Sequence, residues 1–498
     1  MSESTLKSIS PARFIHDNAA MLGLSDNTKA AYMTVRELVE NSLDSAESMG
    51  IQPSIKVELT QLGNKWKLNN SDNGSGIPKI DIPRAFGVVL SSSKYVNKQS
   101  RGFLGMGGKG VIQYAYITTQ EAFTILSATM YSSNYWRFKM GVDINENKPI
   151  IFESEDKPNP TKWHGTVVSL FSKADFDKAM GDIKKYFKLT HLLCPYTSIK
   201  LIVNGKEVLN LSSTVTINPE IPMIIPYHPY GIDTAILDDL IKQNPIDIKT
   251  FLRKSFQRLG TKTISEFIKF SKFDETKSIT SLTKEERVKF VDKMKEFDKF
   301  LPPDVSGLAP IGENVMKQGI MNEFTPEYVG YNNRKGVFGG HGFIVESSVA
   351  YGGGIDSPNK EFDFFVYRFA NKIPLLYGEG SCMLTKTIKE QDFKHYSVDG
   401  LAPLLFSVHL CSTRIPHKTL GKEFIGEQPE IKRELDLVLK ENLRDLHYFI
   451  THKAKLGYNK HRISIFNTYV PVISEQLSLI TSKPKNEIEA KLKKVMNI

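Results

Sequence analysis

One stretch, residues 35–48, constrains this chain more than any other because its polar residues repeat at helical spacing. Glu37, Asn41 and Asp44 stand at i, i+4 and i+7 and so share one face of a predicted helix. The residues on another side are apolar or small enough to pack: Leu38, Val39, Ser42 and Ala46. A carboxylate one turn from an amide can polarise a water or hold a hard cation. An ordinary amphipathic helix has the same pattern, so this stretch alone leaves both interpretations open.

Two glycine-containing stretches follow. Asp72 opens Asp-Asn-Gly-Ser-Gly-Ile after an alternating segment, residues 66–68, that predicts a strand. Glycines let a flat ring approach the backbone, and a carboxylate there can accept a hydrogen bond from an exocyclic amino group. Residues 99–110 are glycine-rich with one internal lysine, a composition that can wrap a polyphosphate with backbone N–H groups. Each stretch alone is a weak signal of function. The helix of residues 35–48 and these two stretches in this order, followed by His164-Gly165-Thr166, form a specific pattern.

The pattern resembles the GHKL ATPases, which include gyrase, the MutL proteins, the histidine kinases and one class of heat-shock chaperone. Among them it is most similar to the B subunits of topoisomerase VI. The resemblance implies that ATP and Mg²⁺ bind here, with Glu37 as the general base for the attacking water and Asn41 as the Mg²⁺ ligand. It also implies that Asp72 and Gly76 bind the adenine ring and that Thr166 helps to hold the same end of the nucleotide.

The resemblance implies a lid over the phosphates. Its nucleotide-binding residues are consecutive: Gly105, Met106, Gly107, Gly108, Lys109 and Gly110. Lys94, in the segment before the lid, is a further candidate for contact with the nucleotide, although a surface lysine is the default interpretation. Gly108 and Gly110 stand where the family has a bulkier residue and an alanine, so we expect the following helix to begin late or loosely.

The composition limits the number of domains, the compartment and the kind of partner that this chain can have. The 498 residues are enough for two to four domains, and no apolar run reaches the length of a membrane-spanning helix. Three widely spaced cysteines and the absence of a signal-peptide pattern favour a reducing intracellular compartment: the cytoplasm, or the nucleus in a eukaryote. A net charge of +10 permits a polyanionic partner such as double-stranded DNA, but basic enzymes without such a partner are also common.

The predicted fold class is α+β, with three domains and a tail. Strand-like residues 114–119, 123–126 and 136–139 predict a sheet with helices on one face, the GHKL (Bergerat) sandwich. We expect the ATPase domain with an N-terminal strap over residues 1–225. A helical insert that resembles a helix-two-turns-helix module follows over 226–300. An α/β transducer that ends in a long helix spans 301–475, with Pro471 as a break or kink, and a basic tail covers 476–498.

The transducer resemblance rests on several motifs, among them residues 310–313, 341–346, 367–377 and 409–423. It implies that Lys422 reaches back as a catalytic sensor of the γ-phosphate; without it, a solvated loop lysine is the default. Phe393-Lys394-His395-Tyr396 replaces a tryptophan-lysine-x-tyrosine loop thought to touch DNA. Phenylalanine can still stack on a partner but lacks the indole N–H donor, so DNA coupling is expected to be altered.

The predicted function is the ATP-hydrolysing subunit of a type IIB DNA topoisomerase. ATP would dimerise two copies around duplex DNA, and a separate chain like the A subunits of topoisomerase VI would cleave the DNA within an A2B2 heterotetramer. Two alternatives remain. One is a non-hydrolysing scaffold for a homologue of the A subunits, which the intact Glu37, Asn41 and Asp72 argue against. The other is a different GHKL machine, which the insert and the transducer motifs argue against.

Overall fold

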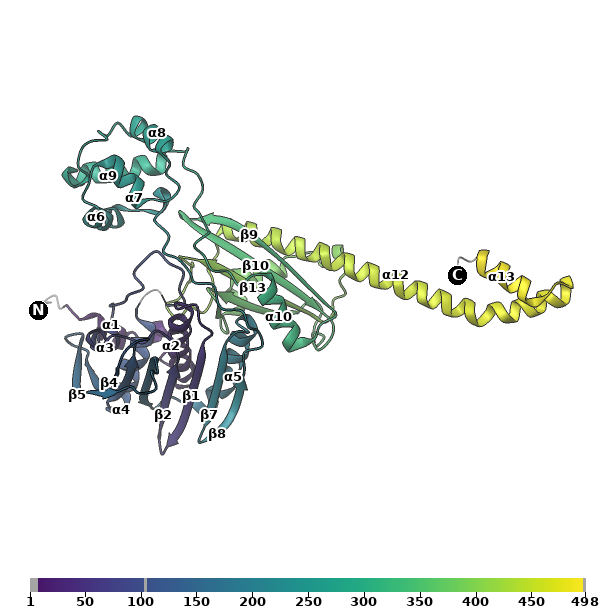
Figure 1. Cartoon of the computed structure of the whole chain (residues 1–498), viewed down its shortest axis with the longest axis horizontal. Coiled ribbons are helices and arrows are strands. Elements are labelled where there is room, and N and C mark those ends of the chain that lie inside the picture. Colours follow the sequence, from purple (N-terminus) through teal and green to yellow (C-terminus); the bar gives the residue numbers. More distant parts are fainter. Residues whose placement is uncertain (1–7, 103–104, 496–498) are drawn as a thin grey trace, which may run out of the picture.

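The computed structural model describes residues 8–102 and 105–495. An N-terminal sheet with its helices lies below a small helical domain, and a second sheet beside them leads into one long helix (Figure 1). The first seven residues of the expected strap, Phe103 and Leu104 of the glycine-rich stretch, and the last three residues of the basic tail lie outside the described residues. The α+β class is confirmed.

The N-terminal sheet has eight strands in the order β5-β4-β3-β6-β2-β1-β7-β8. All neighbours are antiparallel except β1 and β7, which are parallel. Ile55, Val57 and Leu59 point into the core, as their alternation predicts. The strands are β1 Ser54–Leu62, β2 Lys65–Asp72, β3 Phe123–Ala128, β4 Asn134–Asp143, β5 Lys148–Pro158, β6 Gly165–Ser172, β7 Ser198–Val203 and β8 Lys206–Leu211.

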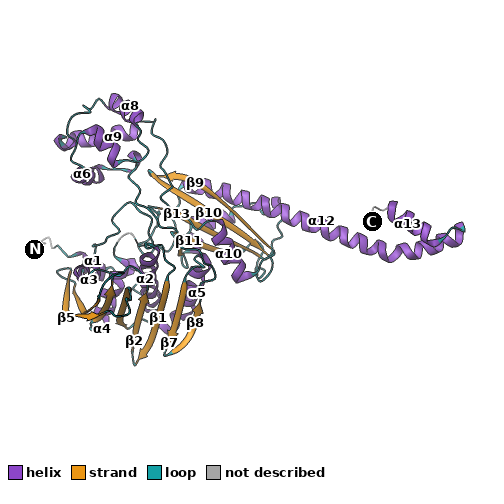
Figure 2. Ribbon diagram, viewed as in Figure 1, coloured by secondary structure: helices purple, strands orange, loops and turns teal. Residues whose placement is uncertain are grey.

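Helices cover one face of this sheet (Figure 2). They are α1 Pro11–Asp17, α2 Asn27–Glu47, α3 Ile82–Gly87, α4 Gly107–Thr119 and α5 Phe176–Leu193. Asp26, a favourable N-cap residue, caps the start of α2 by accepting a hydrogen bond from Lys29 N at 2.7 Å. Buried Leu38, Val39 and Leu43 place its apolar side in the core, so its polar side faces outward to the candidate site.

Two expectations around α4 are wrong. Residues 114–119 are the end of this helix and not a strand: their aromatic and β-branched side chains favour strands locally, but Val111, Ile112 and Ala115 bury a helical face against β6. The helix also begins at Gly107 and not later, in spite of its glycines. Tertiary packing has therefore overridden the low helix propensity of this segment.

The helical insert has a hydrophobic core of its own, formed around Phe251, Phe267 and Phe290. Its last helix begins with a capping box in which Thr283 and Glu286 each bond the other's backbone N–H, as their spacing predicts. The helices are α6 Thr234–Gln243, α7 Ile248–Ser255, α8 Thr261–Ser271 and α9 Lys284–Glu296.

The transducer sheet has the order β12-β11-β13-β10-β9 and is covered on both faces. The first part of α12 packs on one face through Leu435, Leu439, Leu443 and Leu446, and α10 packs on the other against the end of α5. The elements are α10 Glu313–Phe324, β9 Tyr328–Phe338, β10 His341–Tyr351, β11 Phe365–Ala370, β12 Ile373–Pro374, α11 Met383–Lys389, β13 Leu404–Ser412, α12 Pro429–Thr481 and α13 Lys485–Val495.

The long helix α12 leaves the sheet and folds back into α13 (Figure 1). Of the break or kink expected at Pro471, the break does not occur, because the helix runs through this residue to Thr481. The domain boundary expected at residue 475 therefore falls inside α12. Within residues 8–102 and 105–495, no helix is long and apolar enough to cross a membrane.

The side chain of Phe393 is not exposed, as a contact with DNA would require. It is buried in the transducer core, 5.0 Å from the ring of Phe364 and 5.9 Å from that of Phe406. The expectation that this ring stacks on a partner is therefore wrong, because its face is already occupied by neighbouring aromatic side chains. Lys394 and His395 remain exposed.

Replacing Leu439 by alanine should destabilise the transducer by about 2–5 kcal/mol, because its side chain is fully buried between α12 and the sheet. Leu437→Ala on the same helix is the matched control, since Leu437 is 37 % exposed. Urea unfolding of both full-length variants measures the difference. Equal losses for the two leucines would contradict the packing of α12 described here.

Candidate active site

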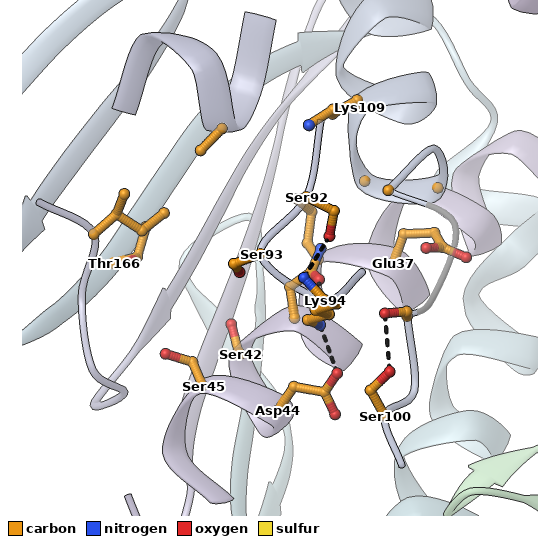
Figure 3. A pocket seen from close by; sticks show the side chains of 18 of the residues that line it. Glu37, Ser42, Asp44, Ser45, Ser92, Ser93, Lys94, Ser100, Lys109 and Thr166 are labelled. Atoms are coloured by element: carbon orange, nitrogen blue, oxygen red, sulfur yellow. Dashed lines mark hydrogen bonds and ion pairs between the residues drawn. The ribbon is translucent and has the colours of Figure 1, made fainter. Parts of the chain in front are cut away.

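The polar face of α2 opens into a cavity of about 730 Å³. The end of β2, the N-terminus of α4, the loop before it and a transducer loop form the other walls. Figure 3 shows Glu37, Lys109 and Thr166 around this cavity. The structure brings together all the predicted site residues except one: Glu37, Asn41, Asp72, Gly76, Lys94, Gly105, Met106, Gly107, Gly108, Lys109, Thr166 and Lys422. Gly110 is the exception, because it faces the core, where an added Cβ would lie 2.5 Å from Leu22 Cδ1.

Glu37 lies in a buried cluster of opposite charges. Arg36 Nη2 is 2.7 Å from Glu37 Oε1, and Arg36 Nε is 3.1 Å from Glu40 Oε1. Lys422 reaches in from the transducer, with its Nζ 2.9 Å from Glu40 Oε2 and 3.7 Å from Glu37 Oε1. Burial alone would raise the pKa of Glu37, but Lys422 and Arg36 outweigh it and hold that pKa below its usual value. Burial dominates at Glu40, whose pKa is raised.

Two glycines let α4 approach α2 closely. An added Cβ on Gly107 would lie 1.8 Å from Glu37 Oε2, and one on Gly108 would lie 2.7 Å from Asn41 Nδ2. The glycines are therefore required by contact with the two most chemically active side chains of α2. The first N–H groups of a helix have no intrahelical acceptor, so the N-terminus of α4 presents a positive end to this part of the cavity.

Asp72 closes the far end of the cavity. Its Oδ2 accepts a hydrogen bond from Ser42 Oγ at 2.8 Å, and its Oδ1 accepts from Gly74 N at 2.9 Å and Thr166 N at 3.1 Å. Burial raises the pKa of Asp72 in spite of these donors. Gly76 has φ +66°, and an added Cβ would meet the carbonyl oxygen of Ala128 at 1.9 Å, so no other residue fits there.

The two candidate phosphate-binding lysines have different surroundings. Lys94 Nζ lies 2.5 Å from Asp44 Oδ2 (Figure 3). It also lies 3.3 Å from Asn41 Oδ1. Burial would raise the pKa of Asp44, but Lys94 and Arg101 lower it to about 2. Lys109 donates a hydrogen bond to the carbonyl oxygen of Ser91, and burial lowers the pKa of Lys109 to about 8.

Sequence reasoning missed several residues of the site. Ser42 was expected only to pack, yet its hydroxyl orients Asp72 and accepts a hydrogen bond from Asn70 Nδ2 at 2.8 Å. Only the fold reveals this role, because it depends on β2 lying beside α2. Arg36 and Glu40 form an i, i+4 pair that flanks Glu37, and this spacing could have identified them. Only the fold reveals Arg101, which joins Asp44 and Glu47 from the loop before α4.

Comparisons with known families agree with this architecture. The family described as "Histidine kinase-, DNA gyrase B-, and HSP90-like ATPase" matches residues 26–112, and the family "Topoisomerase VI B subunit, transducer" matches residues 303–462. The chain is thus an ATPase of the first class that carries a transducer.

Similar proteins extend over nearly the whole chain. The type 2 DNA topoisomerase 6 B subunit of Sulfurisphaera tokodaii is 37 % identical over 96 % of this chain and 91 % of its own. The B subunit of the same enzyme from Metallosphaera sedula is 37 % identical over 97 % of this chain and 92 % of its own. This chain belongs to the family of type 2 DNA topoisomerase 6 B subunits, the ATPase subunits of type IIB topoisomerases. Likeness to solved structures is weaker: an Aquifex aeolicus MutL ATPase domain, complexed with ADP, matches at 14 % identity and a TM-score of 0.30, covering 75 % of this chain and 89 % of its own.

The ion pairs of Asp44 predict a pH dependence of stability. Because its pKa is depressed to about 2 in the folded protein, Asp44 stabilises the fold fully above its unfolded pKa of about 3.9. That contribution, about 2 kcal/mol, is lost as the pH falls from about 4 toward 2. Asp44→Asn should therefore be less stable than the wild type at pH 7, and the gap should narrow only below pH 4 in urea unfolding. The exposed Asp298→Asn is the control, and the same pH profile for both variants would refute the assignment.

Proposed function

We propose that this chain binds ATP with Mg²⁺ in the cavity on α2 and hydrolyses the γ-phosphate with Glu37 as general base. The observation that carries the proposal is the position of Glu37, whose carboxylate lies against Gly107 at the N-terminus of α4, in the same cavity as Asn41 and Asp72. A helix N-terminus binds anions through its free N–H groups, so a terminal phosphate that binds there would lie beside the base.

The adenine end is assigned to Asp72. Its carboxylate accepts three hydrogen bonds from the protein, and two carboxylate oxygens have capacity for about four. The remaining lone pair can accept an exocyclic amino group, as the amino group of adenine would supply. Gly76 lines the cavity beside Asp72, and Thr166 fixes Asp72 through its backbone N–H.

The phosphates are assigned to residues 105–109, with Lys109 and Lys94 supplying positive charge. Mg²⁺ fits the donor set, because it needs only one or two oxygen ligands from the protein when substrate phosphates provide others. Asn41 Oδ1 would be the protein ligand: it faces the cavity and has Lys94 Nζ as a neighbour at 3.3 Å. When bound, Mg²⁺ neutralises phosphate charge.

The pairing of Glu37 explains how hydrolysis can be controlled. A carboxylate held by Arg36 and Lys422 is a weak base because its pKa is low. A γ-phosphate would offer Lys422 a stronger anionic partner. When Lys422 moves from Glu37 to the phosphate, the pKa of the Glu37 carboxylate rises toward its usual value. The base is then activated only when ATP is present. Loss of the phosphate returns Lys422 to Glu37 and Glu40 and changes the position of its domain.

The partners follow from the family. Membership of a family of B subunits implies a partner chain of the A type, and we propose an A2B2 heterotetramer in which ATP dimerises two copies of this chain around double-stranded DNA. We assign strand cleavage to the A-type chain and place the assembly in the cytoplasm. No cluster of three or more His, Cys, Asp or Glu side chains suited to a metal occurs in the part of this chain that the structure describes.

Glu37→Gln should lower kcat for ATP hydrolysis by about 10²-fold or more, because the amide cannot accept the proton of the attacking water. ATP binding should remain, and a non-hydrolysable ATP analogue with Mg²⁺ should still convert monomers to dimers. Phosphate release and solution mass are the measurements, with the exposed Glu146→Gln as control. ATP hydrolysis by Glu37→Gln at the wild-type rate would exclude Glu37 as the general base. A wild-type mass that is indifferent to nucleotide would instead favour the scaffold alternative.

Nucleotide binding should also take up a proton near pH 8.5. Lys109, with a pKa of about 8, is largely neutral there, and an adjacent polyphosphate raises its pKa until it is charged. Calorimetry in buffers of different ionisation enthalpy should therefore detect uptake of about three-quarters of a proton. Lys109→Met should abolish the uptake and the exposed Lys206→Met should not. Equal uptake in Lys109→Met would show that this lysine does not contact the phosphates.

A further inference from the structure

A second transducer element enters the ATPase domain away from Lys422. It is the two-residue turn between β11 and β12, formed by Asn371 and Lys372. Both residues have positive φ, 45° and 66°, as the tight turn of a hairpin requires. A lysine in this conformation is unfavourable and persists only where its surroundings hold it. Both residues are buried.

Lys372 contacts the C-terminal end of α2. Its Nζ lies 3.6 Å from Glu47 Oε2 and 3.4 Å from the hydroxyl of Tyr196, which itself donates to Glu47 Oε1 at 2.9 Å. Arg101 forms a two-pronged pair with the same carboxylate, at 2.8 Å on each oxygen. Glu47 is thus held by one cation of the transducer and one cation of the segment that leads into the lid.

That segment, which we term the lid stem (Gln99, Ser100 and Arg101), is also bound to the transducer. Asn371 Nδ2 donates to Ser100 O at 3.2 Å. The side chain of Gln99 makes two hydrogen bonds with the backbone of Ala309, donating to its carbonyl at 3.1 Å and accepting from its N–H at 2.7 Å.

The turn is rigidly joined to the transducer behind it. The N–H of Lys372 donates to His409 Nε2 at 2.9 Å, so the proton of this imidazole lies on Nδ1, 2.7 Å from Glu346 Oε2. Glu346 also accepts hydrogen bonds from Ile311 N at 2.9 Å and Gly312 N at 2.7 Å, at the start of α10. One buried network therefore connects the turn, the sheet and the entry to α10.

We propose that the turn of Asn371 and Lys372 is the pivot on which the transducer moves, and that both are positioning residues for the ATPase reaction. The proposal rests on the ATP-dependent function proposed above. Lys422 faces the cavity, and a phosphate would change its partners. Lys372 is paired with Glu47, a carboxylate that Arg101 already holds. The binding of nucleotide would therefore not change the partners of Lys372. The transducer then rotates by releasing one lysine while the other keeps α2 and the lid stem in place.

The test measures an interdomain distance in the full chain. The three native cysteines are buried, so spin labels can be attached at Lys206→Cys and Lys360→Cys, both exposed positions on the two domains. Lys372→Met and Asn371→Ala should at least double the width of the ligand-free distance distribution and lower kcat about threefold or more, with KM nearly unchanged. Lys372→Arg should preserve the wild-type width. The exposed Lys389→Met, which loses only a surface pair with Asp363, is the matched control.

Wild-type width in both Lys372→Met and Asn371→Ala would overturn the pivot. If Lys372→Met does not fold, the same criterion applies to Asn371→Ala, which leaves the buried charges intact. The ligand-free width tests the pivot without nucleotide. The shift of the wild-type distance with a non-hydrolysable ATP analogue and Mg²⁺ tests the proposed function, so the two can fail separately.

Discussion

The structure depends on one row of carboxylates along the polar face of α2. Glu37, Glu40 and Glu47 are buried, and the side chain of Asp44 is only 12 % exposed. An isolated charge is too costly to be retained in such surroundings. Each carboxylate must therefore find a cation, and α2 itself supplies only Arg36. The others come from distant segments: Lys94 and Arg101 from the loop before α4, and Lys372 and Lys422 from the transducer. Pairing these charges fixes the lid stem and the transducer on the ATPase domain.

Under the function proposed above, the same row of carboxylates would also make the arrangement of the domains responsive to nucleotide. Removing one partner from a buried pair costs about 3–5 kcal/mol, which is a large part of the stability of a domain. A triphosphate brings several negative charges into the cavity and competes for the same cations. Lys94 and Lys422 line the cavity and can exchange partners, whereas Arg101 is held by two hydrogen bonds to Glu47. In the function proposed above, the binding of ATP would therefore change the ion-pair partners at the domain boundary.

The sequence predicted the site best where chemistry follows local spacing. Short segments determine three features: the shared face of Glu37 and Asn41, the strand that ends at Asp72, and the glycines that let α4 approach α2. All three features lie at the same cavity. It could not predict contacts made by the fold: Ser42 acts on Asp72 only because β2 lies beside α2. Local propensity was misleading at residues 114–119, where packing against β6 decides. It was also misleading at Phe393, where an aromatic ring expected at a surface completes a core.

Two lysines of the transducer, Lys372 and Lys422, pair with carboxylates of the same helix, α2, and this raises a mechanical question. The transducer is also attached by the packing of α10 against the end of α5, so it can change its angle to the ATPase domain without separating from it. Rotation requires that one contact outlast the other. The two lysines differ in this respect: the side chain of Lys422 is 12 % exposed and lines the cavity, whereas that of Lys372 is 5 % exposed and covered by Tyr196. The cavity proposed for nucleotide thus adjoins the first lysine and not the second, and under the proposed pivot this difference in burial would set the order in which the contacts break.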